Sequence, residues 1–256
     1  MRIAILANTD TGGAGAAAVK LLKLFESYGY QACLLVMKST TGQKNIHEIK
    51  PRFYFLHKCW MFAWHLYLSQ IKPDPNFYFF SKDERFSAFS GSDICRALPY
   101  NPHYIVPVSI SGFVNFRALA DLALLTKAKV YFWLADMGSF TGGCHYSWDC
   151  EGYRFKCNQC PALLSGFFSS LAAQNLRRRI FHASRAQFHA IGGSAWVANQ
   201  AMHSQIFSGL HKIWSTNSVI DFQIFNSDSR DKAKFTLGIP DEKFVIFAAA
   251  TVISEK

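Results

Sequence analysis

Four cysteines fall close together in residues 136–161, which read DMGSFTGGCHYSWDCEGYRFKCNQCP. They are Cys144, Cys150, Cys157 and Cys160, in the spacing C-x5-C-x6-C-x2-C. Four thiols this close can hold a tetrahedral metal ion or pair as two disulfides. Cys157-x-x-Cys160 has the usual spacing of half a zinc site, whereas the five residues between Cys144 and Cys150 form a wider half.

The sequence predicts a structural metal at these cysteines, with zinc as the first choice and an iron–sulfur cluster as the second. His145 is an alternative ligand. Reduced or partly disulfide-bonded cysteines without a metal remain the other interpretation. Four protein ligands leave no open coordination position, so the predicted metal would support the loop, and no catalytic metal is expected.

Two polar side chains of the same stretch are candidate binding residues. Asp136 follows a predicted strand at 129–134, where a carboxylate could bind hydroxyl groups or act as a base. The alternative role for Asp136 is to cap a turn. His145 is the second candidate if it does not bind the metal.

The first part of the chain predicts a strand at 2–7, a glycine loop at 12–15, a helix at 14–28 and a strand at 31–37. Gly13-x-Gly15-x-x-Ala18 formally matches a dinucleotide fingerprint, but the glycines lie too far beyond the strand. Lys38 also stands where a ribose-binding acidic residue would be needed. We therefore expect the amides of Gly12 and Gly13 to face a phosphate or a sugar; otherwise these glycines only permit a tight turn.

Further strands are predicted at 104–110, 129–134 and 244–250, with helices at 116–125, 163–188, 194–207 and 231–237. Residues 76–103 are rich in aromatic side chains and predict a loop. Alternating strands and helices are typical of an α/β protein with a Rossmann-like, doubly wound parallel sheet. The cysteine loop follows the strand at 129–134, at the edge of the sheet where such folds bind ligands.

Residues 53–71 predict a helix that is apolar almost all round and carries many aromatic side chains. Such a helix could lie at the surface of a membrane, with its basic residues facing lipid phosphates. A helix buried in the core or in an interface explains the same pattern.

The composition and the net charge limit the binding partners that we expect. The 256 residues are 50% hydrophobic and only 17% charged, and the net charge is +10. This charge suggests an anionic neighbour, such as nucleic acid, a phosphorylated small molecule or an acidic membrane surface, although general solubility explains it too. No nucleic-acid-binding motif accompanies it, so nucleic acid is not expected.

No signal peptide or spanning segment is visible, so we expect a cytoplasmic protein, peripheral to a membrane if 53–71 binds one. Reduced thiols in that compartment favour metal over disulfides.

The motif DMxxFTGGCHY at 136–146, followed by Asp149-Cys150 and Cys157-x-x-Cys160-Pro161, resembles a subgroup of glycosyltransferase family 4. That subgroup acts in exopolysaccharide and O-antigen assembly. Other segments resemble the family in the same order: Thr11-Gly12-Gly13-Ala14, Ser194-Ala195-Trp196-Val197, the interdomain segment at 219–225, and 237–250, which is similar to the start of the second domain.

The resemblance implies a GT-B architecture, in which two Rossmann-like domains face each other across a cleft. Residues 1–225 would be the acceptor-side domain, and 226–256 the interdomain segment and first strand of a truncated donor domain. The implied reaction is retaining transfer from a nucleotide-sugar to a glycan acceptor, often one linked to a lipid, in surface polysaccharide biosynthesis.

Two departures from the family pattern bear on activity. Ala135 stands where the family has a histidine, and the E-x7-E motif of the donor domain does not follow. We therefore expect no transfer by this chain alone. A non-catalytic module that binds glycolipid or a membrane surface is the alternative function.

Overall fold

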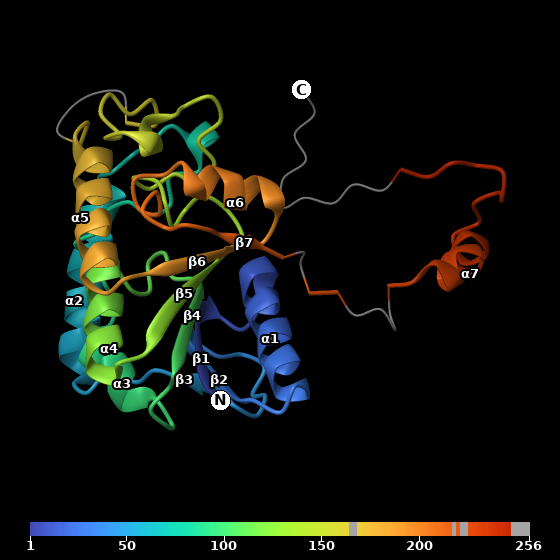
Figure 1. Cartoon of the computed structure of the whole chain (residues 1–256), viewed down its shortest axis with the longest axis horizontal. Helices are drawn as coiled ribbons and strands as arrows, with labels where there is room; N and C mark the ends of the chain where they lie inside the picture. The colour runs from blue at the N-terminus through green and yellow to red at the C-terminus, as the bar shows by residue number, and fades with distance from the viewer. Residues whose placement is uncertain (164–167, 217–218, 221–224, 247–256) are drawn as a thin grey trace. The chain divides into compact units, whose positions relative to one another are not determined.

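The computed structural model describes residues 1–163, 168–216, 219–220 and 225–246. These residues contain a seven-stranded parallel sheet in the order β3-β2-β1-β4-β5-β6-β7 (Figure 1). The fold is therefore α/β and Rossmann-like, as predicted. The strands are β1 (Arg2–Thr9), β2 (Gln31–Lys38), β3 (Ile46–Glu48), β4 (Tyr104–Ser109), β5 (Lys129–Leu134), β6 (His189–Gly192) and β7 (Trp214–Ser215).

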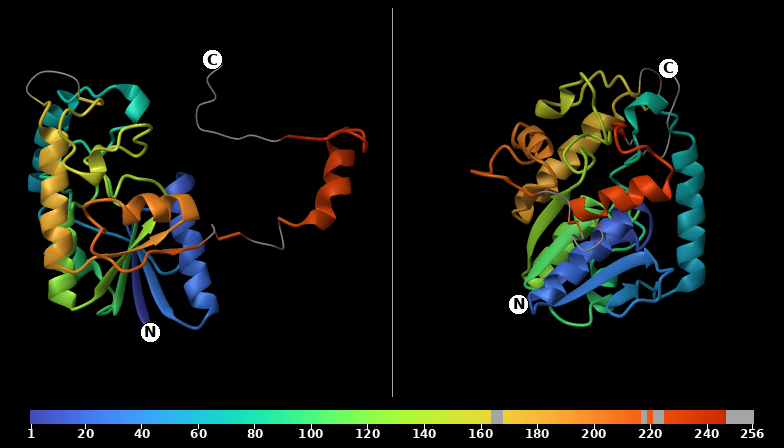
Figure 2. Two further views of the ribbon diagram at one scale, coloured as in Figure 1. Left: turned by 45° about the horizontal axis from the view of Figure 1, so that its top comes forward. Right: turned by 90° about the vertical axis from the view of Figure 1, so that its right-hand side faces the viewer.

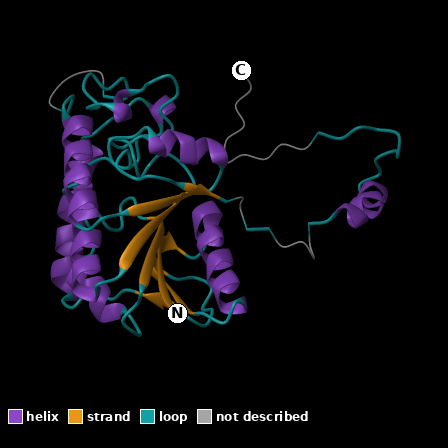
Figure 3. Ribbon diagram, viewed as in Figure 1, coloured by secondary structure: helices purple, strands orange, loops and turns teal. Residues whose placement is uncertain are grey.

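Helices cover both faces of the sheet (Figures 1 and 3). The helices around the sheet are α1 (Gly12–Ser27), α2 (Tyr54–Ser69), α3 (Gly91–Ala97), α4 (Phe116–Thr126), α5 (Leu171–Arg185) and α6 (Ala195–Met202), and a further helix, α7 (Arg230–Thr236), belongs to a separate unit. Figure 2 shows the helix α1 on one face from two further directions. Alternation along β1 explains the two layers: Ile3 and Ile5 pack in the core beneath α1, whereas Leu6 packs in the core of the other face.

The chain divides into two compact units, Met1–Val219 and Ile220–Lys256. The first contains the sheet and helices α1 to α6. The second contains α7, which agrees with the helix predicted at 231–237. Lys234 anchors the turn after α7 by donating to the carbonyl oxygens of Asp241 and, at 2.8 Å, Lys243. Most of the strand predicted at 244–250 lies outside the described residues, and residues 244–246 are not in a strand.

Some predicted boundaries were wrong. The helix predicted at 163–188 is α5, which begins at Leu171, and α6 ends at Met202 rather than at 207. The short helix α3 lies in a segment whose aromatic content predicted a loop. Its N-terminus is set locally, because Ser90 and Asp93 form a capping box.

Helix α2 has no buried residue, so the prediction of a helix inside the core is wrong for this segment. Its inner side packs on residues 83–89: Trp64 contacts Phe86 with ring centroids 5.3 Å apart, and His57 stacks on Phe89 at 4.9 Å. Tyr67 also points inward and donates its hydroxyl to Asp83 at 2.9 Å, whereas Tyr54, Phe55 and Phe62 are exposed.

The glycine loop connects β1 to α1. A Cβ atom at Gly15 would lie 2.6 Å from the carbonyl oxygen of Thr9, so glycine at 15 lets α1 approach the end of β1. No atom lies within 4 Å of a Cβ placed at Gly12 or Gly13. Close packing therefore requires Gly15, while Gly12 has a left-handed backbone with φ of 73° that favours glycine.

Candidate functional site

A polar pocket lies where β4 and β5 end. Because both strands are parallel, the loops after them meet at the same edge of the sheet. The pocket has a volume of about 90 Å³. Ser109 and Ser111 line it from the β4 side, and Asp136 and His145 line it from the loop after β5.

Asp136 and His145 form a hydrogen-bonded pair in this pocket. His145 Nδ1 lies 2.9 Å from Asp136 Oδ2, and the amide of Gly138 donates to Asp136 Oδ1 at 2.7 Å. The amide of Met137 donates to the carbonyl oxygen of His145, which folds the loop back on itself. The two residues that the sequence predicted as binding residues are therefore brought into direct contact.

The other ring nitrogen of His145, Nε2, is buried and has no hydrogen-bond partner among the described residues. A proton on Nδ1, shared with Asp136, leaves Nε2 as a hydrogen-bond acceptor. A Cβ atom at Gly138 would lie 2.9 Å from both Nε2 and Asp136 Oδ1, so glycine at 138 keeps the pair uncrowded. The arrangement provides an oriented imidazole for a ligand that donates a hydrogen bond.

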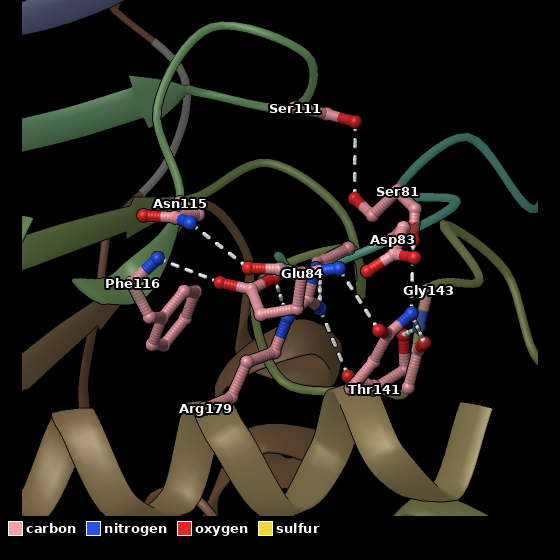
Figure 4. A network of polar contacts seen from close by, with 12 residues as sticks. Ser81, Asp83, Glu84, Ser111, Asn115, Phe116, Thr141, Gly143 and Arg179 are labelled. Carbon is pink, nitrogen blue, oxygen red and sulfur yellow. Dashed lines mark hydrogen bonds and ion pairs between the residues drawn. The ribbon is translucent and has the colours of Figure 1, made fainter. Parts of the chain in front are cut away.

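A buried ion pair holds the loop that lines the pocket. Arg179 on α5 donates from Nε to Glu84 Oε2 at 2.8 Å, and both side chains are almost fully buried. Figure 4 shows Arg179 reaching from α5 to Glu84 and Thr141. Its Nη1 donates to the carbonyl oxygens of Gly138 at 2.6 Å and Thr141 at 2.9 Å. One side chain thus fixes the loop that carries Asp136 and His145.

Glu84 links the same network to α4. The amide of Phe116, in the first turn of α4, donates to Glu84 Oε1 at 2.6 Å. A carboxylate is favoured there by the unpaired amides and the positive end of the helix dipole. Asn115 caps the helix by accepting from the amide of Ala118 at 2.8 Å, and its Nδ2 donates to the carbonyl oxygen of Glu84.

Asn175 lies one helical turn before Arg179 on α5 and is completely buried. Its Oδ1 accepts from the amide of Glu84 at 2.9 Å, and its Nδ2 donates to the carbonyl oxygen of Gly142 at 3.0 Å. Asn175 and Arg179 therefore hold segments 81–84 and 138–142 together. The spacing i, i+4 places both side chains on one face of α5.

Sequence reasoning missed Glu84 and Asn175 and read Arg179 differently. From the sequence, the run Arg177–Arg179 predicts a helix face that either binds phosphate or anionic lipid or is simply solvated. In the structure Arg177 is exposed while Arg179 is buried, because positions two apart point to different sides of a helix. The helical period of α5 could have revealed Asn175 and Arg179, because it places them on the same side of the helix as the apolar Leu171, Ala172 and Leu176.

The four predicted metal ligands all line one small cavity of about 20 Å³. The thiol of Cys144 lies against Cys160, and that hydrogen bond, helped by the amides of Ala162 and Leu163, lowers the pKa of Cys160 to about 7 against the opposing effect of burial. The same contact with Cys160, followed by burial, raises the pKa of Cys144. Burial raises the pKa of Cys157 to about 12.

Amide groups directed at a sulfur stabilise a thiolate, which is the form that binds zinc. Among the described residues, however, no three His, Cys, Asp or Glu side chains are already arranged around a common metal position. The side chains would have to turn toward one point to bind an ion. Zinc at this cluster therefore stays a prediction.

Gly12 and Gly13 do not line the pocket of Asp136 and His145. Asp10 lies next to this loop, and its carboxylate is hydrogen-bonded within the protein. It accepts from the hydroxyls of Ser39 at 2.8 Å and Thr41 at 2.6 Å. Burial alone would raise the pKa of Asp10, but hydrogen bonds from Thr41, Thr40 and Ser39 outweigh it and hold the pKa well below its usual range. The segment after β2 is thereby tied to the end of β1.

No protein-family model matches the chain, and no curated protein matches it significantly. Among solved structures, dTDP-glucose 4,6-dehydratase from Bacillus anthracis in complex with NAD is similar, with 11% identity and a TM-score of 0.33. That match covers 75% of this chain, which spans about half (53%) of the dehydratase. The 3-alpha-hydroxysteroid dehydrogenase from Pseudomonas sp. B-0831 with NADH also matches at 11% identity and a TM-score of 0.31, over 88% of this chain and 98% of the dehydrogenase. Similarities this weak do not indicate a function.

The buried pair predicts that Arg179→Leu strongly destabilises the fold, because it leaves the Glu84 carboxylate buried without its partner. We expect the free energy of unfolding to fall by about 3–5 kcal/mol, measured by urea denaturation. Arg177→Leu is the matched control on the exposed side of α5 and should change it by less than about 0.5 kcal/mol. Equal effects of the two substitutions would contradict the assigned role of Arg179.

The cysteine cavity predicts about one equivalent of zinc per chain in protein purified under reducing conditions with zinc supplied. Elemental analysis measures this content. Cys144→Ser should lower it markedly, whereas Cys59→Ser, which changes an exposed thiol on α2, should not. Metal-free wild-type protein, or the same zinc content in both variants, would rule out the cluster as a zinc site.

Proposed function

We propose that the unit Met1–Val219 is the acceptor-binding side of a glycosyltransferase similar to family 4. The observation that carries this proposal is the Asp136–His145 pair, whose Nε2 is left free at the edge where the parallel strands end. The sequence resemblance supplies the reaction: transfer of a sugar from a nucleotide-sugar to a glycan acceptor, possible when a second domain binds the donor.

Hydroxyl groups of a sugar both donate and accept hydrogen bonds, and the pocket offers partners for both. Nε2 of His145 and the carboxylate of Asp136 can accept, and the hydroxyls of Ser109 and Ser111 can donate or accept. A hydroxyl that donates to Nε2 presents its oxygen lone pairs toward an incoming donor sugar. His145 could also take the proton that this hydroxyl loses, with Asp136 stabilising the resulting imidazolium.

Ala135 bears on this proposal, since the family has a histidine there. Ala135 is exposed and directly precedes Asp136. In this chain His145 supplies the imidazole that lines the pocket. We propose that His145 rather than residue 135 orients the acceptor.

A second candidate function is binding to an anionic membrane surface through α2. Residues 49–73 contain Lys50, Arg52, Lys58 and Lys72 but no aspartate or glutamate. Lys58 lies 4.6 Å from the ring centroid of Tyr54, which places basic and aromatic groups together on the exposed side.

Exposed aromatic side chains beside basic ones are typical of helices that lie in a lipid interface. No described helix has the length and apolarity needed to cross a bilayer. Surface binding would suit an acceptor carried on a lipid.

The acceptor proposal predicts that the chain binds a neutral oligosaccharide and that His145→Ala weakens this binding. Losing a buried hydrogen-bond acceptor costs about 1–3 kcal/mol, so we expect a rise of about tenfold or more in Kd. Ligand-observed NMR with a panel of oligosaccharides, free and linked to a lipid diphosphate, measures it.

His203→Ala is the matched control, because His203 is exposed and bonds only within its own helix end. A wild-type chain that binds none of the glycans would refute the proposal. The catalytic part is tested by fusing a family 4-like donor domain after Lys256: the fusion should transfer sugar, and His145→Ala should lower its kcat/KM.

The membrane proposal predicts co-sedimentation of the chain with vesicles that contain anionic lipid, weakening as salt is raised. Phe62→Ser together with Lys58→Glu should abolish it. Phe181→Ser, an exposed phenylalanine on α5, is the control and should leave it unchanged. Equal sedimentation with neutral and anionic vesicles, or binding by the double variant, would count against α2 as the membrane surface.

A further inference from the structure

Four aromatic side chains lie exposed in a row beside His145. They are Tyr78, Phe80, Tyr146 and Trp148, with exposed fractions between 41% and 66%. The ring centroids of successive members are 5.9 to 6.2 Å apart, in the order Phe80, Tyr78, Tyr146, Trp148. Phe80 also contacts the ring of His145 at 5.1 Å, so the aromatic row begins at the pocket.

Backbone pairing between two loops presents these rings. Phe79 and Cys144 form an antiparallel bridge, and the amide of His145 donates to the carbonyl oxygen of Tyr78 at 3.1 Å. Phe79 is buried against Gly143, where a Cβ atom would lie 2.4 Å from its ring. Since side chains alternate along an extended segment, burial of Phe79 directs Tyr78 and Phe80 outward.

Two members of the row have an unusual backbone. Tyr78 and Trp148 have left-handed conformations with φ of 47° and 48°. This conformation is uncommon for bulky residues and costs on the order of 1–3 kcal/mol, so it persists only where surrounding contacts impose it. The indole of Trp148 is held by its hydrogen bond to the carbonyl oxygen of Asn76 at 2.6 Å. Strain that keeps apolar rings in solvent indicates a ligand rather than a contribution to folding.

The charges around the row limit the chemistry of that ligand. Segments 73–80 and 144–150 contain Asp74 and Asp149 but no lysine or arginine. The pocket end has the carboxylates of Asp83, Glu84 and Asp136 and two cations, Lys82 and Arg179, which donate to carbonyl oxygens and to Glu84 within the protein itself. The charges left to face a ligand are therefore carboxylates, which disfavour a nucleic acid or a phosphorylated chain. A neutral polyhydroxylated ligand can instead donate to them and lay its apolar C–H faces on the rings, whose faces carry partial negative charge.

We propose that Tyr78, Phe80, Tyr146 and Trp148 form an aromatic platform for successive pyranose rings of a neutral oligosaccharide, which contacts both ring faces and ring edges because neighbouring aromatic rings are inclined by 31° to 79°. The terminal sugar lies in the Asp136–His145 pocket, and the preceding sugars lie along the aromatic row. This inference rests on the proposed acceptor function and adds the ligand class, a chain of several uncharged sugars.

The experiment compares Kd for a series of one to four sugars, by ligand-observed NMR and by quenching of tryptophan fluorescence. Wild-type affinity should rise with each added sugar. Phe80→Ala and Trp148→Ala should each weaken binding of the longest glycan by about tenfold, because truncating an aromatic contact residue typically costs more than about 1 kcal/mol of binding free energy. Trp148→Ala should change binding of the single sugar much less, whereas Phe80→Ala should weaken it too, because Phe80 also lines the pocket. Trp196→Ala, an exposed tryptophan on α6, is the control.

The outcomes separate this inference from the function on which it rests. Glycan binding that rises with length equally in wild type, Phe80→Ala and Trp148→Ala overturns the platform and leaves the acceptor function standing. Binding of no glycan by wild type overturns both. Tighter binding of a sulfated glycan or single-stranded nucleic acid than of the neutral series overturns the platform. Phe80 makes no polar contact through its side chain, so Phe80→Ala tests the row even if Trp148→Ala perturbs the loop that bonds to Asn76.

Discussion

The buried ion pair between Glu84 and Arg179 is the interaction on which the candidate site depends. Two charges taken out of water are tolerated only when each is paired and further hydrogen-bonded. Arg179 satisfies this by also binding the carbonyl oxygens of Gly138 and Thr141, and Glu84 by accepting the first-turn amide of Phe116. The pair thus joins α4, α5 and the loop after β5, three elements distant in sequence.

The same requirement explains why an irregular loop can carry a defined pair of residues. Residues 136–145 have no regular secondary structure, so their backbone groups need partners from elsewhere. Arg179 and Asn175 supply several of them, and Asp136 supplies another within the loop. The position of His145 therefore follows from a rigid surround of helices and strands, which is how a loop site gains a fixed geometry.

The pocket contributes little to the net charge of +10. It is lined by Lys82 and Arg179 but also by Asp83, Glu84 and Asp136, and exposed aromatic rings lie beside it. Basic residues gather instead on and around α2, such as Lys58 and Arg52, where no acidic residue occurs between 49 and 73. A neutral sugar chain at one surface and an anionic lipid at the other would suit this division, and neither surface requires a change in the fold.

The sequence by itself determined the α/β class, most strands, and the neighbourhood of Asp136, His145 and the cysteines, because hydrophobic period and local spacing are recorded along the chain. It did not reveal that Gly12 and Gly13 lie outside the pocket, that Glu84 meets Arg179, or that two separate loops join to form the aromatic row. Those facts depend on contacts between residues about 65 to 95 positions apart. Only the tertiary structure decided them, since a local pattern of residue types contains no information on which distant segments pack together.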